Sequence, residues 1–356
     1  MKLITRYLIS RLSIASLYAL FALLALYSFF DIISEMGDLG KGSYGTAAML
    51  QYVLLQIPAH IYELLPLAVL IGGLLTLSQL AANSELTVIR TSGMSNSDII
   101  RILLRFGLIF AALTALLGEI GAPASARYAD NLKAGAIDGK ISAGSGGLWI
   151  KEQNDIINVQ EMLPDRTLKG ITVFHHSDGF TLTAETKAES AVVQQDGTWL
   201  LKNVSRSLIG EQAIRTEQHA NESWPTGMKR RLLDVLLVDP NQMSVNALGA
   251  YISHLNDNHQ QSTPYRIAWW RKLFYPVAAA VMALVALAFT PQSTRNGNLG
   301  LKLFLGIGLG LAFHFASRLF AYTSQLYAIP PFIAGSLPTI VFALLAVYLI
   351  RKQERR

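Results

Sequence analysis

Two groups of basic residues lie beside apolar segments, where a charge is costly unless it has a partner or a function. His314 and Arg318 are four residues apart within one such segment, so they share a face of the helix. An ionisable pair at this depth usually faces a cavity, although pairing with another subunit would also satisfy it. Arg271 and Lys272 interleave with aromatic residues at the start of another segment. Because Arg and Lys bind phosphate well, these residues predict a site for an anionic lipid headgroup, with an aromatic belt and snorkelling cations as the alternative.

The motifs of several enzyme classes are absent from the sequence. There is no Gly-x-x-x-x-Gly-Lys-Ser/Thr phosphate loop, so we do not expect the chain to hydrolyse ATP in the P-loop manner. There is also no Gly-x-Ser-x-Gly or His-Glu-x-x-His motif, and the chain has no cysteine for a thiolate nucleophile. His175 and His176 are adjacent in a predicted strand, so their side chains point to opposite faces and a shared metal site is not expected. The sequence therefore predicts a protein that is not an enzyme.

Composition shows that the elements carrying these residues belong in a membrane. The chain has 356 residues, of which 51% are hydrophobic and only 15% charged, and its mean hydropathy is +0.35. Its net charge of +6 comes from basic residues at the ends of apolar runs, a pattern that orients membrane proteins and is unlike a nucleic-acid-binding surface. Six runs are predicted to span a membrane, at about 12–33, 54–80, 102–120, 274–289, 301–322 and 332–350.

The charges that flank the spans predict their orientation. Basic residues precede the first span and acids follow it, and the last six residues are strongly basic. We therefore expect both ends of the chain in the cytoplasm and residues 124–263 in the periplasm. The first run is too long for a typical signal peptide and lacks a small-residue cleavage pattern, so it is expected to stay as a span.

The cations near the outer ends of the spans extend the headgroup hypothesis. Glu63 and Glu119 lie at the same depth, and we expect them to form structural ion pairs with some of these cations. The candidate headgroup residues are Lys41, Arg127, Lys133, Arg266, Arg271, Lys272, His314 and Arg318.

The loop between the second and third spans is predicted to contain a short helix. Asn83–Ser84 can cap its start, and Glu85 lies in its first turn, where the helix dipole favours an acid. Gly93 can end it in a left-handed conformation, and Ser95 with Asp98 has the spacing of a capping box that opens the next helix. A short, rigid helix at the membrane surface suits the transmission of motion from a soluble partner, although an ordinary interfacial helix has the same pattern.

Residues 124–263 have a different character from the spans. Short alternating segments at 156–159, 170–174 and 198–201 are separated by turn signals at 164–165, 177–179 and 196–197. They predict an antiparallel jelly roll or sandwich, followed by an amphipathic helix from Val245 to Leu255. The predicted fold is therefore an α+β membrane protein, with spans one to three in 1–123, a periplasmic β jelly-roll domain and connecting helix in 124–263, and spans four to six in 264–356.

Several motifs resemble those of one known family. Ser84-Glu85-Leu86 and Ser92-Gly93-Met94 follow the second span, and Gly118-Glu119, Gly147-Leu148-Trp149-Ile150-Lys151 and Ile329-Pro330-Pro331 occur further along. With six spans and a β domain between the third and fourth, the whole chain resembles the LptF/LptG permeases, the membrane halves of the Lpt ABC transporter that exports lipopolysaccharide in Gram-negative bacteria. The Gly-Leu-Trp segment and residues 270–276 favour the G-type over the F-type subunit.

This resemblance implies a permease that extracts lipopolysaccharide from the inner membrane and passes it to a periplasmic bridge towards the outer membrane. The implied partners are the F-type permease LptF, an LptB ATPase homodimer, the single-span protein LptC and, indirectly, the bridge protein LptA. ATP and Mg²⁺ would bind to the ATPase, and no cofactor is implied for this chain. Spans one and five would form the lateral gates, and the residues coupled to the ATPase would be Ser84, Glu85, Leu86, Ile89, Arg90 and Gly93.

One segment departs from the family pattern. The family carries lysines just after the first span, whereas this chain has Asp31, Glu35 and Asp38 with Lys41 alone. This difference shifts the expected headgroup contacts towards Lys133 and the cations of the fourth and fifth spans. Alternatively, the acids bind divalent cations that bridge to phosphate.

The expected substrate sets the mechanism and its rivals. Exposing one acyl chain of about a dozen carbons to water costs roughly 10 kcal/mol, so a lipid extractor must keep the chains covered. We expect an apolar cavity between two permeases, lined by Leu26, Phe29, Phe30 and Ile33, with the β domain receiving the chains between its sheets. The alternatives are a lipoprotein-release or mechanotransmission type of ABC permease, which has four spans, and a membrane enzyme acting on a lipid-linked substrate.

Overall fold

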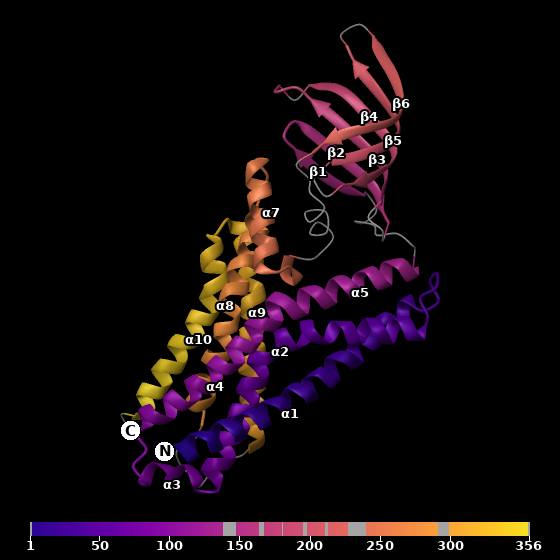
Figure 1. Cartoon of the computed structure of the whole chain (residues 1–356). Coiled ribbons are helices and arrows are strands. Elements are labelled where there is room, and N and C mark those ends of the chain that lie inside the picture. Colours follow the sequence, from indigo (N-terminus) through magenta and orange to yellow (C-terminus); the bar gives the residue numbers. More distant parts are fainter. Residues whose placement is uncertain are drawn as a thin grey trace.

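Six long apolar helices and one antiparallel sheet make up the computed structural model of this chain (Figure 1). The structure describes residues 2–137, 147–163, 167–179, 181–194, 198–210, 213–226, 240–290 and 299–354. The six helices are long and apolar enough to cross a membrane, and the sheet is inserted between the third and fourth of them. The predicted six spans and inserted β unit are therefore confirmed. The spans are α1 (Lys2–Glu35), α2 (Thr46–Ala82), α4 (Asn96–Leu116) continued by η2 (Leu117–Gly121) and α5 (Ala122–Ile137), α8 (Thr263–Ala288), α9 (Leu299–Tyr327) and α10 (Pro331–Glu354).

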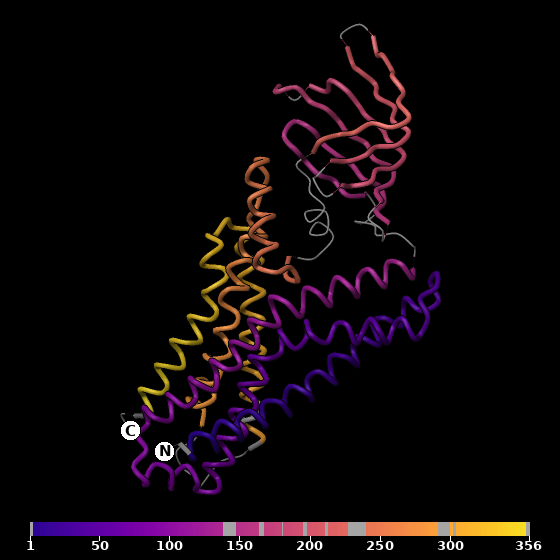
Figure 2. The backbone as a smooth tube through the Cα atoms, viewed as in Figure 1, coloured from indigo at the N-terminus to yellow at the C-terminus, as the bar shows by residue number. Residues whose placement is uncertain are grey.

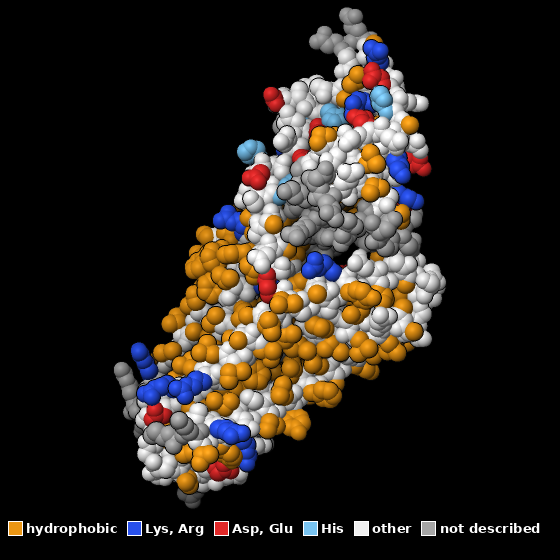
Figure 3. All heavy atoms as spheres, viewed as in Figure 1, with side chains coloured by type: hydrophobic (Ala, Val, Ile, Leu, Met, Phe, Trp, Pro, Cys, Tyr) orange, Lys and Arg blue, Asp and Glu red, His pale blue; other side chains and the backbone are white. Residues whose placement is uncertain are grey.

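The two ends of the helical bundle carry different parts of the chain. Both chain termini lie at one end, together with the short helix α3 (Glu85–Thr91), and we call this the terminal end (Figure 2). The sheet lies beyond the opposite end, which we call the sheet end (Figure 1). In the space-filling view, apolar side chains cover the bundle between the two ends, whereas Lys and Arg side chains gather at the terminal end (Figure 3). Because the number of spans is even, both chain termini lie at the same end of the bundle.

Helix α2 is the centre of the bundle, and α1 and α9 lie outside it. The most apolar stretch of α2 is 83% buried, against 22% for α1 and 28% for α9. Close packing depends on small residues, since a Cβ at Gly72 would lie 2.4 Å from the backbone nitrogen of Ser16, and one at Gly107 would lie 2.5 Å from the Cα of Ala280. Because so little of α1 and α9 is buried, each of these helices keeps one broad apolar face exposed.

The six strands form a single sheet whose spatial order follows the chain. Connections of two to five residues join neighbouring strands, so each strand pairs with the next one in the sequence. The described strands therefore run up and down, without the Greek-key crossovers between two sheets that a jelly roll has. The predicted turn at 177–179 lies between the third and fourth strands, while those at 164–165 and 196–197 lie outside the described residues. The strands are β1 (Leu148–Glu152), β2 (Asp155–Met162), β3 (Thr167–His176), β4 (Leu182–Val193), β5 (Thr198–Ile209) and β6 (Ile214–Pro225).

One face of this sheet has its own apolar core. Ile157, Leu168 and Trp199 are fully buried there, and the Trp199 ring packs edge-on against Trp224 at 5.6 Å. Alternate residues of each strand reach this face, as the period of two requires. The core is thus filled by the protein's own side chains.

Helix α7 (Val245–Asp257) lies between the bundle and the sheet (Figure 1). Ser244 caps its start, as its position before the predicted helix suggested. Beyond its far end, the Asn258 side chain accepts the backbone N–H of Gln153 at 2.7 Å, and Gln260 donates to the Lys151 carbonyl at 3.4 Å. These bonds connect the β1–β2 turn to the segment between α7 and α8.

Candidate functional site

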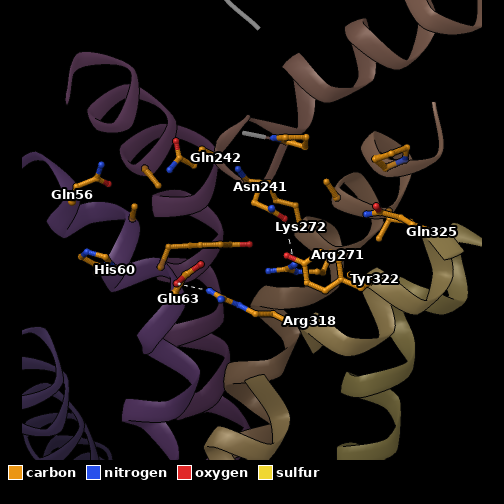
Figure 4. A pocket seen from close by; sticks show the side chains of 18 residues that line it. Gln56, His60, Glu63, Asn241, Gln242, Arg271, Lys272, Arg318, Tyr322 and Gln325 are labelled. Carbon is orange, nitrogen blue, oxygen red and sulfur yellow. Dashed lines mark hydrogen bonds and ion pairs between the residues drawn. The ribbon is translucent and has the colours of Figure 1, made fainter. Parts of the chain in front are cut away.

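A polar cavity of about 390 Å³ lies near the sheet end of the bundle, between α2, α8 and α9, and η3 (Pro240–Gln242) contributes to its wall (Figure 4). Three of the eight predicted headgroup residues line it, namely Arg271 and Lys272 from α8 and Arg318 from α9. Glu63 from α2 points towards Arg318, and His60, also from α2, lies further from these cations. The amide side chains in its wall are Gln56, Asn241, Gln242 and Gln325.

Helical periodicity brings these residues to one place. On α9, Arg318, Tyr322 and Gln325 are separated by four and three residues, so they lie on one face. The same spacing places the cavity residues of α2 and α8 on single faces of those helices. A hydrogen bond of 2.6 Å from the Tyr275 hydroxyl to the Glu63 carbonyl holds α8 against α2.

The three cations of the cavity differ in their partners. The Lys272 ammonium is buried, donates to the Met243 carbonyl and lies 5.7 Å from the centre of the Tyr62 ring. The Arg271 guanidinium donates to the Asn241 side chain at 3.3 Å. Two of the cations therefore donate their hydrogen bonds to neutral oxygens, and Lys272 also interacts electrostatically with the Glu119 carboxylate, which does not line the cavity.

Among the described residues of the cavity wall, Arg318 is the cation that has an anionic partner. Its Nη2 lies 3.9 Å from Oε2 of Glu63, which is within ion-pair range but beyond the 2.7–2.9 Å typical of a charge-assisted hydrogen bond. The expected ion pair of Glu63 is thus confirmed. The cavity as a whole keeps an excess of positive charge and suits an anionic group with several oxygen acceptors.

Glu119 does not follow the same expectation. Its carboxylate accepts the backbone N–H of Val245 at 2.8 Å and the side-chain amide of Asn246 at 3.2 Å. Among the described residues Glu119 thus forms no direct ion pair but contacts the first turn of α7, where unsatisfied N–H groups and the helix dipole favour a carboxylate. Its attraction to the expected cations is limited to a longer-range interaction with Lys272. Sequence could not reveal the contact with α7 because this element lies far along the chain.

Two other predicted headgroup residues belong to a separate set of charges, the Lys133 cluster, which consists of Glu35, Asp38, Lys41, Tyr44 and Lys133. The Lys133 ammonium lies 2.8 Å from carboxylate oxygens of both Glu35 and Asp38, and Lys41 lies 2.6 Å from Asp38. The buried Tyr44 hydroxyl donates to Glu35 at 2.8 Å, and burial together with this carboxylate raises the pKa of Tyr44. The acids after the first span therefore compensate nearby cations of the same chain.

Asp31, the remaining acid of that segment, has a different partner. Its carboxylate lies 2.6 Å from the ring nitrogen Nε2 of His60, which also lines the polar cavity. Each of the three acids that depart from the family pattern is thus bound to a side chain of this chain.

The other predicted headgroup residues lie outside the cavity. Arg127 donates to the Pro123 carbonyl at 2.9 Å along α5, and Arg266 is exposed on α8. His314 lies one turn from Arg318 on α9 and is half-buried, but it does not line the cavity. The shared helix face predicted for His314 and Arg318 therefore does not bring both to one pocket.

The residues predicted to cover acyl chains form an exposed stripe along α1. Leu26, Phe29, Phe30 and Ile33 are 50–59% exposed, and their spacing of three and four residues places them on one face. No other described element of this chain covers them, so the stripe is available to lipid or to a partner.

A second, apolar groove of about 610 Å³ lies between α1, α2 and Ile307 of α9. It is lined from α1 by residues that include Arg11, Ile14, Tyr18 and Leu23. This groove was not predicted from the sequence. Arg11, Ile14 and Tyr18 are three and four residues apart, so they lie on one face of α1. Periodicity alone could mark this face of α1, but not the helix that would lie opposite it.

Helix α3 has one face in the bundle and one face exposed. Leu86 and Ile89 are buried in the bundle core, whereas Val88 is 64% exposed. Gly93, with φ of +93°, follows the helix end, as predicted. The predicted capping box is also present, since the Ser95 side chain and the Asp98 carboxylate each accept the other's backbone N–H.

The start of α3 differs from the prediction. Ser84 has φ of +60° and makes no side-chain capping bond, because its left-handed conformation turns the chain between α2 and α3. Glu85 accepts a hydrogen bond from the Tyr7 hydroxyl of α1 at 2.8 Å, a contact that the sequence did not indicate. This bond and a weaker one from Asn83 hold the pKa of Glu85 below its ordinary value.

Arg90 completes the predicted coupling set. Its Nε atom is buried without a hydrogen-bond partner among the described residues. The side chain borders a small pocket with Asn96, Ile99 and Gln353. This arrangement leaves one buried donor of Arg90 unsatisfied at the terminal end.

Comparisons with known proteins bear on the whole chain. Residues 6–352 match the sequence model of a family described as lipopolysaccharide export system permease LptF/LptG. The lipopolysaccharide export system permease protein LptG of Escherichia coli (strain K12) is 29% identical over 325 residues, which cover 90% of both chains. The protein of the same name from Haemophilus influenzae is 28% identical over 324 residues, again 90% of both chains.

Proposed function

Since the chain belongs to the lipopolysaccharide export system permease LptF/LptG family, we propose that its polar cavity binds the anionic headgroup of lipopolysaccharide during extraction. The chain is a multi-pass permease subunit for lipopolysaccharide export, of the ABC transporter type. The six spans and the position of the sheet differ from the four-span pattern of the lipoprotein-release permeases. What we propose concerns the residues that bind the lipid and the partners that drive it.

The observation that supports the headgroup site is the convergence of Arg271, Lys272 and Arg318 on one cavity. A phosphate group accepts several hydrogen bonds, and guanidinium groups bind it in a two-pronged geometry. The Arg271 guanidinium donates to a neutral amide oxygen, which leaves its charge available to such a group. Neighbouring amides, among them Asn241 and Gln325, can bond to sugar hydroxyls.

The acyl chains require a separate, apolar path. Each chain costs roughly 10 kcal/mol to expose to water, so it must stay covered while the headgroup moves. The exposed α1 stripe from Leu26 to Ile33 can form one wall of that path, and the partner permease LptF the facing wall. The apolar groove beside Tyr18 would extend this wall towards the terminal end.

The driving force would come from an ATPase that contacts α3. We assign the terminal end to the cytoplasm, because basic residues flank both ends of the chain there. The face of α3 with the exposed Val88 would contact a homodimer of LptB, which binds ATP and Mg²⁺, and we expect the neighbouring Arg90 to take part in this contact. Because Leu86 and Ile89 are embedded in the bundle and Glu85 is bonded to Tyr7, movement of α3 would shift α1.

We assign the sheet to the periplasm, because it lies beyond the end of the bundle opposite to the terminal end. LptC and, beyond it, the bridge protein LptA would accept the lipid in the periplasm on its way from the inner to the outer membrane. We expect the chain itself to hold no cofactor, with nucleotide chemistry confined to the ATPase.

Photo-crosslinking tests the lipid path. A photo-reactive residue would be placed at Gln325 in the polar cavity, at Phe30 on the α1 stripe, and at Leu344 as a control on the exposed face of α10. In membranes supplied with lipopolysaccharide and ATP, we expect capture at the first two positions and little at the third. Equal capture at all three, or failure of the chain to co-purify with an ATPase, would contradict the proposal.

Charge reversal at Glu85 tests the coupling. Glu85→Lys removes the acceptor for the Tyr7 hydroxyl and reverses the charge at the first turn of α3. We expect the complex to hydrolyse ATP while lipopolysaccharide release falls. Glu217→Lys, on the sheet, is the matched control, and unchanged release in Glu85→Lys would count against the role of α3.

A further inference from the structure

Glu63 is the only acidic side chain among the described residues that line the polar cavity, and it faces three cations there (Figure 4). Arg271 and Lys272 donate to neutral oxygens, and Lys272 also interacts electrostatically with Glu119 outside the cavity. The Glu63 carboxylate forms its ion pair with Arg318. An isolated acid in a cationic anion-binding site weakens that site. The presence of Glu63 in this cavity therefore needs an explanation other than attraction of an anionic ligand.

The Glu63 side chain contacts Arg318 only loosely, whereas the Glu63 backbone is held firmly by a different residue. The closest nitrogen and oxygen atoms are 3.9 Å apart, and the side chains of Arg318 and Glu63 are 55% and 31% exposed. The Glu63 carbonyl, in contrast, accepts a 2.6 Å hydrogen bond from Tyr275. The carboxylate can therefore turn away from Arg318 without disturbing α2, and the partly exposed pair costs little to separate.

Carboxylate and phosphate oxygens bind a guanidinium group in the same way, so both compete for Arg318. A cavity with three cations and no counter-ion would hold a phosphate tightly and release it slowly, whereas a transporter must release what it binds. We propose that Glu63 is a resident competitor, which holds Arg318 when the cavity is empty, is displaced by an incoming phosphate, and helps to expel it. This proposal rests on the assignment of the cavity to the headgroup, and it makes Glu63 a residue that sets release rather than one that binds lipid.

The effect of Glu63 on lipid capture should depend on the charge of the headgroup. Repulsion by Glu63 acts about twice as strongly on a phosphomonoester, with a charge near −2, as on a phosphodiester, with a charge of −1. A net-neutral phosphatidylcholine headgroup should be little affected. A purely structural role for Glu63 would change the capture of all three lipids alike.

The experiment uses the full chain, purified with the partners that it retains, in phosphatidylcholine vesicles. The vesicles carry phosphatidic acid as the phosphomonoester probe or phosphatidylglycerol as the phosphodiester probe, and capture is measured with a photo-reactive residue at Gln325. We expect Glu63→Gln to raise capture of phosphatidic acid by roughly two- to fivefold, the range that a partly exposed ion pair represents, and that of phosphatidylglycerol by less. The gain should shrink at high salt.

Three variants separate the possible results. Glu63→Asp keeps the charge and should stay close to the unsubstituted protein, while Glu217→Gln repeats the substitution in an ion pair of the sheet and should change nothing. Arg318→Gln should lower capture of both anionic lipids. If Arg318→Gln has no effect, the headgroup cavity itself is wrong. If Arg318→Gln lowers capture but Glu63→Gln leaves it unchanged, or raises it equally for all lipids, the resident-competitor role alone is overturned.

Discussion

Two clusters of charged residues near the sheet end of the bundle differ in how far their positive charge is compensated. In the Lys133 cluster, each of the two lysines lies within 2.8 Å of a carboxylate. In the polar cavity, three cations share one carboxylate, whose nearest oxygen is 3.9 Å from Arg318. The first arrangement connects the end of α1 and the segment that follows it to α5, and the second leaves room and charge for a ligand.

The difference shows that the local balance of charge, and not residue type, separates a structural contact from a candidate binding site. Breaking a buried ion pair leaves a charge without a partner and is strongly destabilising, whereas an exposed pair contributes little. Lys133 and Arg318 were equally good headgroup candidates in the sequence. They should therefore respond in opposite ways to substitution.

Loss of Lys133 should give the largest change in stability. Lys133→Met leaves the buried Glu35 carboxylate without its cation, and we expect a loss of about 2–4 kcal/mol in the free energy of unfolding. Denaturant unfolding in detergent micelles measures it. Lys41→Met is the control, because Lys41 is 57% exposed, and a similar loss in both variants would remove the distinction between closed and open clusters.

Loss of Glu119 should have a smaller and more local effect. Glu119→Ala removes the acceptor for the first turn of α7, which we expect to cost about 1–2 kcal/mol, the range for a helix N-cap. Hydrogen exchange should speed up at Val245 and Asn246 and stay unchanged in α10. Faster exchange throughout the bundle would mean that Glu119 acts on overall packing instead.

Loss of Arg318 should affect lipid capture far more than folding. Arg318→Gln breaks a loose, partly exposed pair, so we expect a change in stability of less than about 1 kcal/mol. Capture of lipopolysaccharide by a photo-reactive residue at Gln325 should fall several-fold in the same protein. A stability loss equal to that of Lys133→Met would show that the cavity is a structural cluster too.

We expect the smallest effect at the terminal end, where the neutral Tyr7 hydroxyl donates a hydrogen bond to the Glu85 carboxylate. Tyr7→Phe removes the main cause of the lowered pKa of Glu85, so that pKa should rise towards its ordinary value. Because the folded-state pKa of Glu85 is lowered, its contribution to stability is present at neutral pH and is lost as pH falls through that pKa. Isotope-edited infrared titration of Glu85 measures the shift, and an unchanged pKa would assign it to Asn83 instead.

Local patterns in the sequence predicted much of the fold. Apolar length predicted the six spans, and short alternating segments predicted an antiparallel β unit between the third and fourth. The end of α3 at Gly93 and the capping box of Ser95 and Asp98 were also predicted correctly, because each depends on residues within one turn of one another.

The pairing of side chains across the bundle could not be predicted in the same way. Both Glu63 and Glu119 were expected to pair with cations. Among the described residues Glu63 forms a direct ion pair with Arg318, whereas Glu119 bonds to the start of α7. His314 and Arg318 share a helix face, yet only Arg318 lines the cavity. Helical spacing fixes which residues lie on one face, but not the element that the face meets.

The sequence by itself thus determined the number of spans, the inserted antiparallel unit, and the short helix with its end and the cap that follows, because apolar length, period and capping act over a few residues. Only the tertiary structure decided which cations are compensated, since each partner comes from a different helix. It also decided the order of the strands and the contact between Tyr7 and Glu85. These features depend on distances between residues that are remote in the chain, and no local pattern contains those distances.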